Sequence, residues 1–252
     1  MKALSSGARV EVFETLDSTS LEAKRRAAAG AKGPLWIVAL YQTAGYGRRG
    51  SEWRQQNGDV AATLLFEPGA PGERLPELSF VAALAVFDAI RRYAPSAPLS
   101  LKWPNDILAG DKKIAGLLLE LTGTSASPVV ALGVGVNVVS APEGLDYPTA
   151  RLIDLGAEPP PHPRAFVETL DETFKAWREA WERNGFTEIR TEWLRRAARL
   201  GDRIKVRLPA EVVEGLFKDL DLQGALILDC DGVRRTIAAG AVLPADRLEK
   251  RP

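Results

Sequence analysis

The spacing of apolar side chains predicts several β-strands in the first part of the chain. Short runs that are apolar throughout, or that alternate between apolar and polar residues, are typical of strands. Such runs cover residues 9–14, 35–41, 60–66, 99–103, 106–109, 114–121 and 129–138. Gly110 and Asp111 lie between two of these runs and favour a tight turn. We therefore expect residues 106–121 to form an antiparallel hairpin.

Apolar residues at steps of three and four predict helices elsewhere. The clearest pattern places five large side chains on one helix face: Phe166, Leu170, Phe174, Trp177 and Trp181. Helices are also expected after Ser18-Thr19, from Pro76 to about Tyr93, and over residues 186–199. Because strands and helices do not alternate regularly, the sequence favours an α+β fold, with helices on a mixed or antiparallel sheet, over a doubly wound parallel sheet.

The pattern changes near Gly201, which marks the end of the last predicted helix. Residues 201–246 consist of short strand-like runs, with turn sequences at 221–224 and 231–232. We therefore expect a large α+β domain, the candidate catalytic domain, over residues 1–200. A small β domain, a barrel or sandwich, is expected over residues 201–252.

Composition and charge narrow the classes of function. The 33 Lys and Arg residues balance 33 Asp and Glu residues, so the chain lacks the positive field of a general nucleic-acid-binding protein. The single cysteine, Cys230, cannot form an intramolecular disulfide, which fits a reducing compartment. No apolar run approaches the roughly 20 residues that cross a bilayer, and the amino terminus lacks the apolar core of a signal peptide. A cytoplasmic protein with no membrane or nucleic-acid partner is expected.

A glycine- and arginine-rich segment, residues 45–50 (GYGRRG), is the first candidate for chemistry. Its G-x-G-x-x-G spacing occurs in dinucleotide-binding folds, but there a helix must follow the glycines directly. Here a polar connector, residues 51–58, leads to a strand instead. Arg48 and Arg49 can grip phosphate or carboxylate oxygens, so an anion-binding loop is the better interpretation, with an ordinary solvated loop as the alternative.

Four segments occur together in an order that a known family shares. Residues 102–108 (KWPNDIL), followed by residues 112–120 (KKIAGLLLE), closely resemble the double signature of the biotin protein ligases. Residues 17–19 (DST), 42–53 and 133–137 (GVGVN) are similar to three further segments of that family. The resemblance covers residues 10 to about 246, because the terminal β region also fits the family's small SH3-like domain.

The resemblance implies a ligase of the class II synthetase-like, biotin/lipoate ligase fold. Such an enzyme joins biotin to ATP, with Mg²⁺, to give biotinyl-5′-adenylate, and transfers biotin to a lysine of a biotin carboxyl carrier protein. Only about nine residues precede the first predicted strand, so the DNA-binding helix-turn-helix of some members is not expected, nor is a repressor. The sequence leaves the oligomeric state open.

Two positive side chains are the catalytic candidates. Bringing a carboxylate to the α-phosphate of ATP costs on the order of 4 kcal/mol at about 4 Å in an effective dielectric near 20, so cations must offset the repulsion. Lys113 at the start of its strand and Arg48 in the loop are predicted to do so. Lys112 is expected to point to the opposite face of the strand and into solvent.

The resemblance also implies binding roles for further residues. Ser18, Thr19 and Gln42 are expected to pair with the ureido ring of biotin, whose polar groups would each cost about 1 to 3 kcal/mol if left unpaired. Asn137 resembles a nucleotide contact. Trp53 is expected to be a packing residue or, when the loop closes, a cover for the adenylate. Asp106 is expected to bind Mg²⁺, to orient Lys113 or the incoming lysine, or to serve only the turn. The remaining predicted contacts are Gly45, Tyr46, Arg49, Gly116, Gly133 and Gly135.

Three positions depart from the family pattern. Tyr46 and Ser51 stand where the loop usually has arginine, and Ser20 stands where asparagine usually follows Ser-Thr. The loss of two loop cations is expected to weaken retention of the adenylate more than to change the reaction. Two alternatives stay open: a lipoate or octanoyl ligase or transferase of the same fold, and a noncatalytic biotin sensor.

Overall fold

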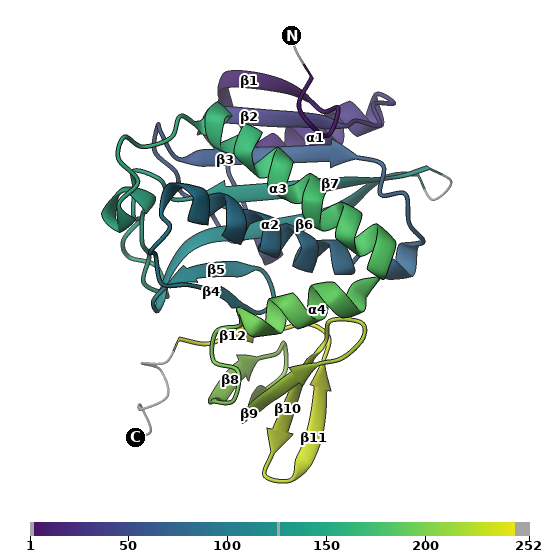
Figure 1. Ribbon diagram of the computed structural model, residues 1–252, viewed down its shortest axis with the longest axis vertical. Helices are drawn as coiled ribbons and strands as arrows, with labels where there is room; N and C mark the ends of the chain where they lie inside the picture. Colours follow the sequence, from purple (N-terminus) through teal and green to yellow (C-terminus); the bar gives the residue numbers. More distant parts are fainter. Residues whose placement is uncertain (1–2, 125–126, 245–252) are drawn as a thin grey trace.

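The computed structural model describes residues 3–124 and 127–244 and contains two β-sheets. The first has seven strands in the order β1-β2-β3-β7-β6-β5-β4 (Figure 1). Its strands are β1 (Arg9–Leu16), β2 (Leu35–Gln42), β3 (Val60–Phe66), β4 (Leu99–Lys102), β5 (Asp106–Ala109), β6 (Lys112–Thr124) and β7 (Ser127–Val136). Only β1 and β2 are parallel, and the other neighbours are antiparallel. The predicted mixed sheet and the predicted hairpin of β5 and β6 are confirmed.

Helices cover both faces of this sheet. The helices are α1 (Thr19–Ala28), α2 (Glu77–Tyr93), α3 (Pro163–Asn184) and α4 (Phe186–Arg195), with short 3₁₀ turns η1 (Arg48–Gly50), η2 (Gly72–Arg74) and η3 (Leu152–Leu155). The long helices α2 and α3 pack together on one face (Figure 1). The helix α1 packs on the other face through Ala23 and Ala27.

The helix α3 carries the pattern of large side chains that the sequence predicts. Phe166, Phe174 and Trp181 are buried in the main core, and the ring of Phe174 meets Phe66 of β3 edge to face at 5.7 Å. The predicted last helix is shorter than expected, because α4 ends at Arg195 rather than near residue 199. A left-handed residue, Arg199 (φ 64°), follows it and turns the chain toward the second sheet.

Strand register sets one row of residues across the first sheet. Lys102 pairs with Asp106, Asp106 with Gly116, Gly116 with Gly135, and Gly135 with Ala61. Directly opposed residues in an antiparallel sheet project to the same face, and neighbouring strands lie about 4.8 Å apart. The row therefore runs over five strands, with small residues at its centre and charged residues at the β4 end, on the face that α1 covers.

The second sheet contains β8 (Arg203–Arg207), β9 (Val212–Leu220), β10 (Leu226–Cys230), β11 (Val233–Ile237) and β12 (Ala241–Val242). Its order, β11-β10-β9-β8-β12, is linear, so closure of the predicted barrel is not seen in the part of the chain that the structure describes. The sheet packs below the first one (Figure 1). The indole of Trp103, between β4 and β5, donates a hydrogen bond to the carbonyl of Gly224 at 3.1 Å and ties the two sheets together.

No helix among residues 3–124 and 127–244 combines the length and the apolar character that crossing a membrane requires. Cys230 carries a free thiol at the end of β10.

Candidate active site

A cavity of about 360 Å³ opens on the α1 face of the first sheet, over the central glycines. It is walled by the start of α1, the loop after β2, the β4–β5 turn and the edge of the second sheet. Twelve of the residues predicted from the sequence line it: Ser18, Thr19, Gln42, Tyr46, Arg48, Arg49, Trp53, Asp106, Lys113, Gly116, Gly133 and Gly135. Gly45 and Asn137, which the sequence also predicted, do not line this cavity.

A cluster of polar side chains forms one end of the cavity. The carbonyl oxygen of Gln42 accepts hydrogen bonds from the backbone N–H of Thr19 at 2.8 Å and from its hydroxyl at 3.1 Å. Thr63 of β3 donates to the hydroxyl of Thr19 at 2.9 Å, and its own hydroxyl lies 3.2 Å from that of Ser20. This network fixes the Gln42 amide so that its NH₂ group is left as a donor. The cluster is therefore held together by hydrogen bonds among the protein's own side chains.

Asp17 holds the entry to α1 in place. Its carboxylate accepts a hydrogen bond from the backbone N–H of Ser18 at 2.7 Å and two from the guanidinium of Arg25, each at 2.8 Å. The hydrogen bonds from Arg25 lower the pKa of Asp17 from 3.8 to about 2. Asp17 thus fixes the backbone on which Ser18 and Thr19 are presented.

Replacing Asp17 with Asn should lower the free energy of unfolding at pH 7 by no more than about 1 kcal/mol, because the pair with Arg25 is largely exposed. The folded-state pKa lies below the unfolded one. The stabilisation is therefore complete above about pH 4 and is lost as the pH falls toward 2. Urea unfolding of both proteins at pH 7 and pH 3 should show a smaller difference at pH 3, and an equal difference would contradict this role.

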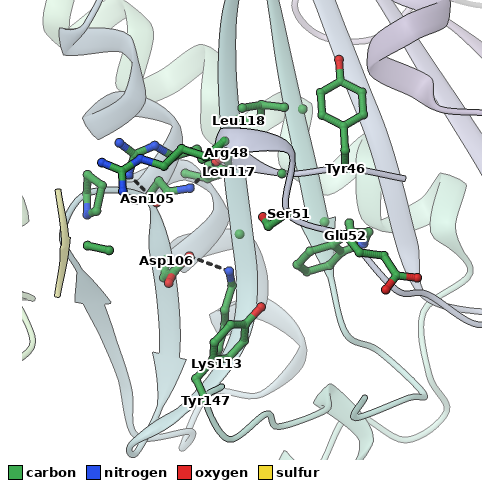
Figure 2. Close-up of a pocket in the computed structure, with 18 of the residues that line it drawn as sticks. Tyr46, Arg48, Ser51, Glu52, Asn105, Asp106, Lys113, Leu117, Leu118 and Tyr147 are labelled. Atoms are coloured by element: carbon green, nitrogen blue, oxygen red, sulfur yellow. Dashed lines mark hydrogen bonds and ion pairs between the residues drawn. The ribbon is translucent and has the colours of Figure 1, made fainter. Parts of the chain in front are cut away.

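Lys113 and Asp106 form the charged end of the cavity. The ammonium of Lys113 lies 2.7 Å from the Asp106 carboxylate, and both side chains are mostly buried (Figure 2). Burial opposes the charged form of Lys113, but the charge of Asp106 and the hydroxyl of Tyr147 outweigh it and raise the pKa of the ammonium. The Lys113 backbone is held by hydrogen bonds to Pro148 and from Ala150, each at 2.9 Å. Lys113 is thus a fixed cation in the cavity.

Arg48 faces the same cavity from the loop (Figure 2). Within residues 3–124 and 127–244, its guanidinium makes only long hydrogen bonds, 3.4 Å each, to the side-chain oxygen of Asn105 and to the carbonyl of Gly240. Burial and the neighbouring Arg49 lower the pKa of Arg48, against the pull of Asp106, but an arginine stays charged in proteins. Arg48 is therefore a positive group with weak protein partners, free to grip an anionic ligand. Its contact with Gly240 brings the second sheet to the site.

Tyr46, which stands in place of a family arginine, fastens the loop to the sheet. Its hydroxyl donates to the carboxylate of Glu120 on β6 at 2.9 Å and accepts from the ammonium of Lys24 on α1 at 3.1 Å. Lys24 and Glu120 also form an ion pair at 2.7 Å. Tyr46 therefore offers the ligand no charge, but it joins the loop to two elements of the domain.

Tyr46→Phe removes the hydroxyl and keeps the ring, so it should loosen the loop. The loss of about 1 kcal/mol of hydrogen bonding would raise the rate of trypsin cleavage in the loop, after Arg48 or Arg49, by about fivefold. Tyr41→Phe is the matched control, because Tyr41 is 46% exposed and lies outside the loop. Equal cleavage rates in the Tyr46 variant and the control would refute the fastening role.

The central glycines make room for Trp53. A β-carbon placed on Gly135 would lie 2.3 Å from the indole of Trp53, and one on Gly116 would lie 3.4 Å from it. The indole therefore lies close against the backbone of β6 and β7, with the ammonium of Lys113 5.7 Å from its ring centre. Its N–H is buried and has no hydrogen-bond partner among the described residues. Trp53 thus covers the middle of the row of small residues.

Asn137 lies behind Lys113 rather than in the cavity. It is 3% exposed, and its side-chain amide donates to the carbonyls of Ala150 at 3.0 Å and Lys113 at 3.4 Å. A contact with a nucleotide stays a prediction, and the geometry shows a residue that braces the strand carrying Lys113. Gly45 likewise acts in the loop, where its carbonyl accepts a hydrogen bond from the Trp53 backbone at 2.9 Å.

The site offers few oxygen ligands for a metal ion. No group of three His, Cys, Asp or Glu side chains capable of holding a metal occurs among residues 3–124 and 127–244. Asp106 is already paired with Lys113. This donor set fits an Mg²⁺ ion that is carried mainly by phosphate oxygens and water, with one carboxylate nearby, rather than a cage built from protein ligands.

The sequence did not single out several residues that line the cavity. These are Lys102 and Asn105 of the KWPND segment, Tyr147, Arg207 and residues 240–244. Lys102 and Asn105 lie within the KWPND motif, so the motif itself could have identified them as candidate site residues. Tyr147 is brought to the cavity by the backbone hydrogen bonds that join Lys113 to Pro148 and Ala150. Arg207 and residues 240–244 belong to the second sheet or follow it, and the packing of the two sheets brings them there.

Comparison with known proteins gives consistent matches. The biotin/lipoate A/B protein ligase family matches residues 12–137, and the biotin protein ligase C terminal domain matches residues 200–243. A biotin--[acetyl-CoA-carboxylase] ligase of Paracoccus denitrificans is 40% identical, over 90% of this chain and 96% of its own length. One from Mycobacterium tuberculosis is 35% identical, over 93% of this chain and 88% of its own length.

Solved structures support the fold. The biotin protein ligase from Aquifex aeolicus, in complex with biotin and ATP, superposes with a TM-score of 0.80 at 23% identity. The match covers 93% of this chain and 97% of that protein.

Proposed function

From the premise that this chain belongs to the biotin/lipoate A/B protein ligase family, we propose that it activates biotin with ATP and transfers it to a lysine of a biotin carboxyl carrier protein. The ligase activity and its two small-molecule substrates follow the names of its relatives in the family. That a biotin carboxyl carrier protein accepts the biotin is our inference from this class of enzyme. One observation supports this use of the cavity above all: the hydrogen-bonded polar cluster around Thr19 and the two cations Lys113 and Arg48 line the same cavity.

In the first step, the biotin head lies against Ser18, Thr19 and Gln42, where hydroxyl and amide groups pair with its ureido ring. The biotin carboxylate then faces the charged end. One carboxylate oxygen forms a bond to the α-phosphorus of ATP, and the bond from that phosphorus to the bridging oxygen breaks, so pyrophosphate leaves. Lys113 and Arg48 offset the repulsion between the two anions and stabilise the charge of the transition state.

In the second step, the amine of an acceptor lysine attacks the carbonyl carbon of the mixed anhydride, and AMP leaves. The acceptor lysine attacks as a neutral amine, after its ammonium has given one proton to solvent, and the nitrogen gives a second proton to solvent as the amide forms. Asp106 keeps Lys113 in place through their ion pair, and Trp53 excludes water from the middle of the site. Mg²⁺, when bound with ATP, would neutralise phosphate charge near Asp106.

We further propose that the domain division lies near residue 200 and that the protein works in the cytoplasm. The second sheet begins at Arg203, and the free thiol of Cys230 is compatible with a reducing compartment. Residues 201–252 would then contribute to the site through Arg207 and Gly240.

The decisive test is release of pyrophosphate by the purified protein. Release that requires biotin and ATP together is expected, followed by biotin incorporation into a carrier domain. Release with lipoate or octanoate in place of biotin would indicate the lipoyl branch of the family. A protein that binds biotin and releases no pyrophosphate would be a sensor, and the proposal would fail.

A further inference from the structure

Asp59 is a fully buried carboxylate that does not line the large cavity. It is 0% exposed and directly precedes β3. One of its oxygens accepts hydrogen bonds from the backbone N–H groups of Val138 at 2.8 Å, Val139 at 2.9 Å and Ser140 at 3.0 Å. The other oxygen accepts from the backbone N–H of Gln56 at 2.8 Å and from the hydroxyl of Ser140. The carboxylate therefore joins two segments that lie far apart in sequence.

The two joined segments touch beside this carboxylate. The first is the connector, residues 51–58, and the second is the 138–150 segment, which follows β7. A β-carbon on Gly58 would lie 3.1 Å from the side chain of Val139, so the connector packs closely against the 138–150 segment. Gly58 also has a φ of 103°, which favours glycine. Because the backbone of both segments is irregular, side-chain contacts such as those of Asp59 decide where they lie.

Both segments reach Lys113. Trp53 of the connector has its ring centre 5.7 Å from the Lys113 ammonium, and Tyr147 of the 138–150 segment has its ring centre 5.1 Å from it (Figure 2). Aromatic faces at such distances attract a cation. The backbone N–H of Lys113 also donates to the carbonyl of Pro148 at 2.9 Å. Each segment therefore contributes one ring to the surroundings of the Lys113 ammonium.

We propose that Asp59 is a positioning residue for Lys113: by joining the connector to the 138–150 segment, it fixes the two aromatic rings that contact the Lys113 ammonium. This role rests on the proposed ligase function, in which Lys113 offsets the repulsion between the biotin carboxylate and the α-phosphate. Asp59 does not line the cavity, so its effect reaches the reaction through Lys113.

The polar cluster around Thr19 is held independently of Asp59. Its side chains come from α1, β2 and β3, and β3 is fixed by backbone pairing with β2 and β7. A shift of the connector and the 138–150 segment should therefore move the rings beside Lys113 and leave the cluster in place. Loss of the Asp59 carboxylate is expected to slow adenylate formation far more than it weakens biotin binding.

Asp59→Asn tests this role, because an amide has one acceptor oxygen where the carboxylate has two. The NH₂ group of the variant would face N–H groups of one of the two segments, donor against donor, and the two would separate. Single-turnover formation of the adenylate should slow by about 10- to 100-fold, as expected when a catalytic group is misplaced by about 1 Å. The dissociation constant of biotin alone, measured by calorimetry, should change by less than about threefold.

Asp171→Asn is the matched control for loss of a buried carboxylate. Asp171 is 1% exposed and accepts hydrogen bonds from Ser5, Ser6 and Trp36. It lies on α3, on the opposite face of the sheet from the cavity. Both variants should lower the free energy of unfolding in urea, and only Asp59→Asn should slow adenylate formation.

A double variant separates positioning from a general loss of structure. In the Lys113→Met background, Asp59→Asn should slow adenylate formation by less than about threefold further, because the group that it positions is gone. Equal slowing by Asp59→Asn in both backgrounds would overturn the inference. So would an unchanged rate in Asp59→Asn, an equal slowing by Asp171→Asn, or a loss of biotin affinity as large as the loss of rate. Failure of the ligase function itself looks different, because the unmodified protein would then release no pyrophosphate with biotin and ATP.

Discussion

Lys113→Met is expected to lower the rate of biotinyl-5′-adenylate formation by on the order of 10³. The substitution removes the fixed cation at the charged end of the cavity and leaves the buried carboxylate of Asp106 without its partner at 2.7 Å. That carboxylate would then repel the incoming phosphate and carboxylate groups, so the change adds a repulsion to the loss of an attraction. Single-turnover formation of the adenylate from biotin and ATP measures the effect.

Lys112→Met is the matched control for this variant. Lys112 is the neighbouring residue of the same strand and is exposed, so its loss removes the same charge from outside the cavity. The control should form adenylate within about twofold of the unmodified rate. If the two variants were equally slow, the rate would depend on the general charge of the hairpin, and the assignment of Lys113 would be wrong.

Arg48→Gly is expected to release the activated biotin. Among the residues that the structure describes, Arg48 has only two hydrogen bonds, both at 3.4 Å, so most of its binding capacity is left for an anionic ligand. A charge-assisted contact of this kind is worth about 1.5 to 3 kcal/mol, so the adenylate should dissociate about 10 to 100 times faster. Because Tyr46 and Ser51 carry no charge, no loop arginine at those positions would compensate.

The measurement is biotin labelling of an unrelated protein, such as serum albumin, in the presence of biotin and ATP. Free adenylate reacts with exposed lysines, so labelling should rise in the Arg48 variant. Arg54→Gly is the control, because Arg54 lies in the connector that follows the loop, pairs with Glu52 at 2.9 Å and does not line the large cavity. Tight retention of adenylate by Arg48→Gly would refute the gripping role of the loop.

The local elements of this fold followed from short-range patterns. The helix α3 was predictable because its large apolar residues recur at steps of three and four, and the hairpin of β5 and β6 because Gly110 and Asp111 interrupt two strand-like runs. The end of α4 was not predictable from the sequence. The left-handed conformation of Arg199 depends on packing, and the spacing of apolar residues carries no information about it. Strand order was also hidden, because β7 inserts between β3 and β6.

The residues of the candidate site also fall into two groups, those that the sequence predicts and those whose role only the tertiary structure shows. The sequence by itself supplied the motifs and, through their resemblance to a family, the candidate cations Lys113 and Arg48 and the polar residues around Thr19. The tertiary structure decided that Asn137 braces a strand, that Lys102 shares a row with the central glycines, and that the second sheet reaches the cavity at Arg207. The reason is physical: side-chain periodicity depends on neighbours along the chain, whereas register across a sheet and the docking of two sheets depend on contacts between residues far apart in sequence.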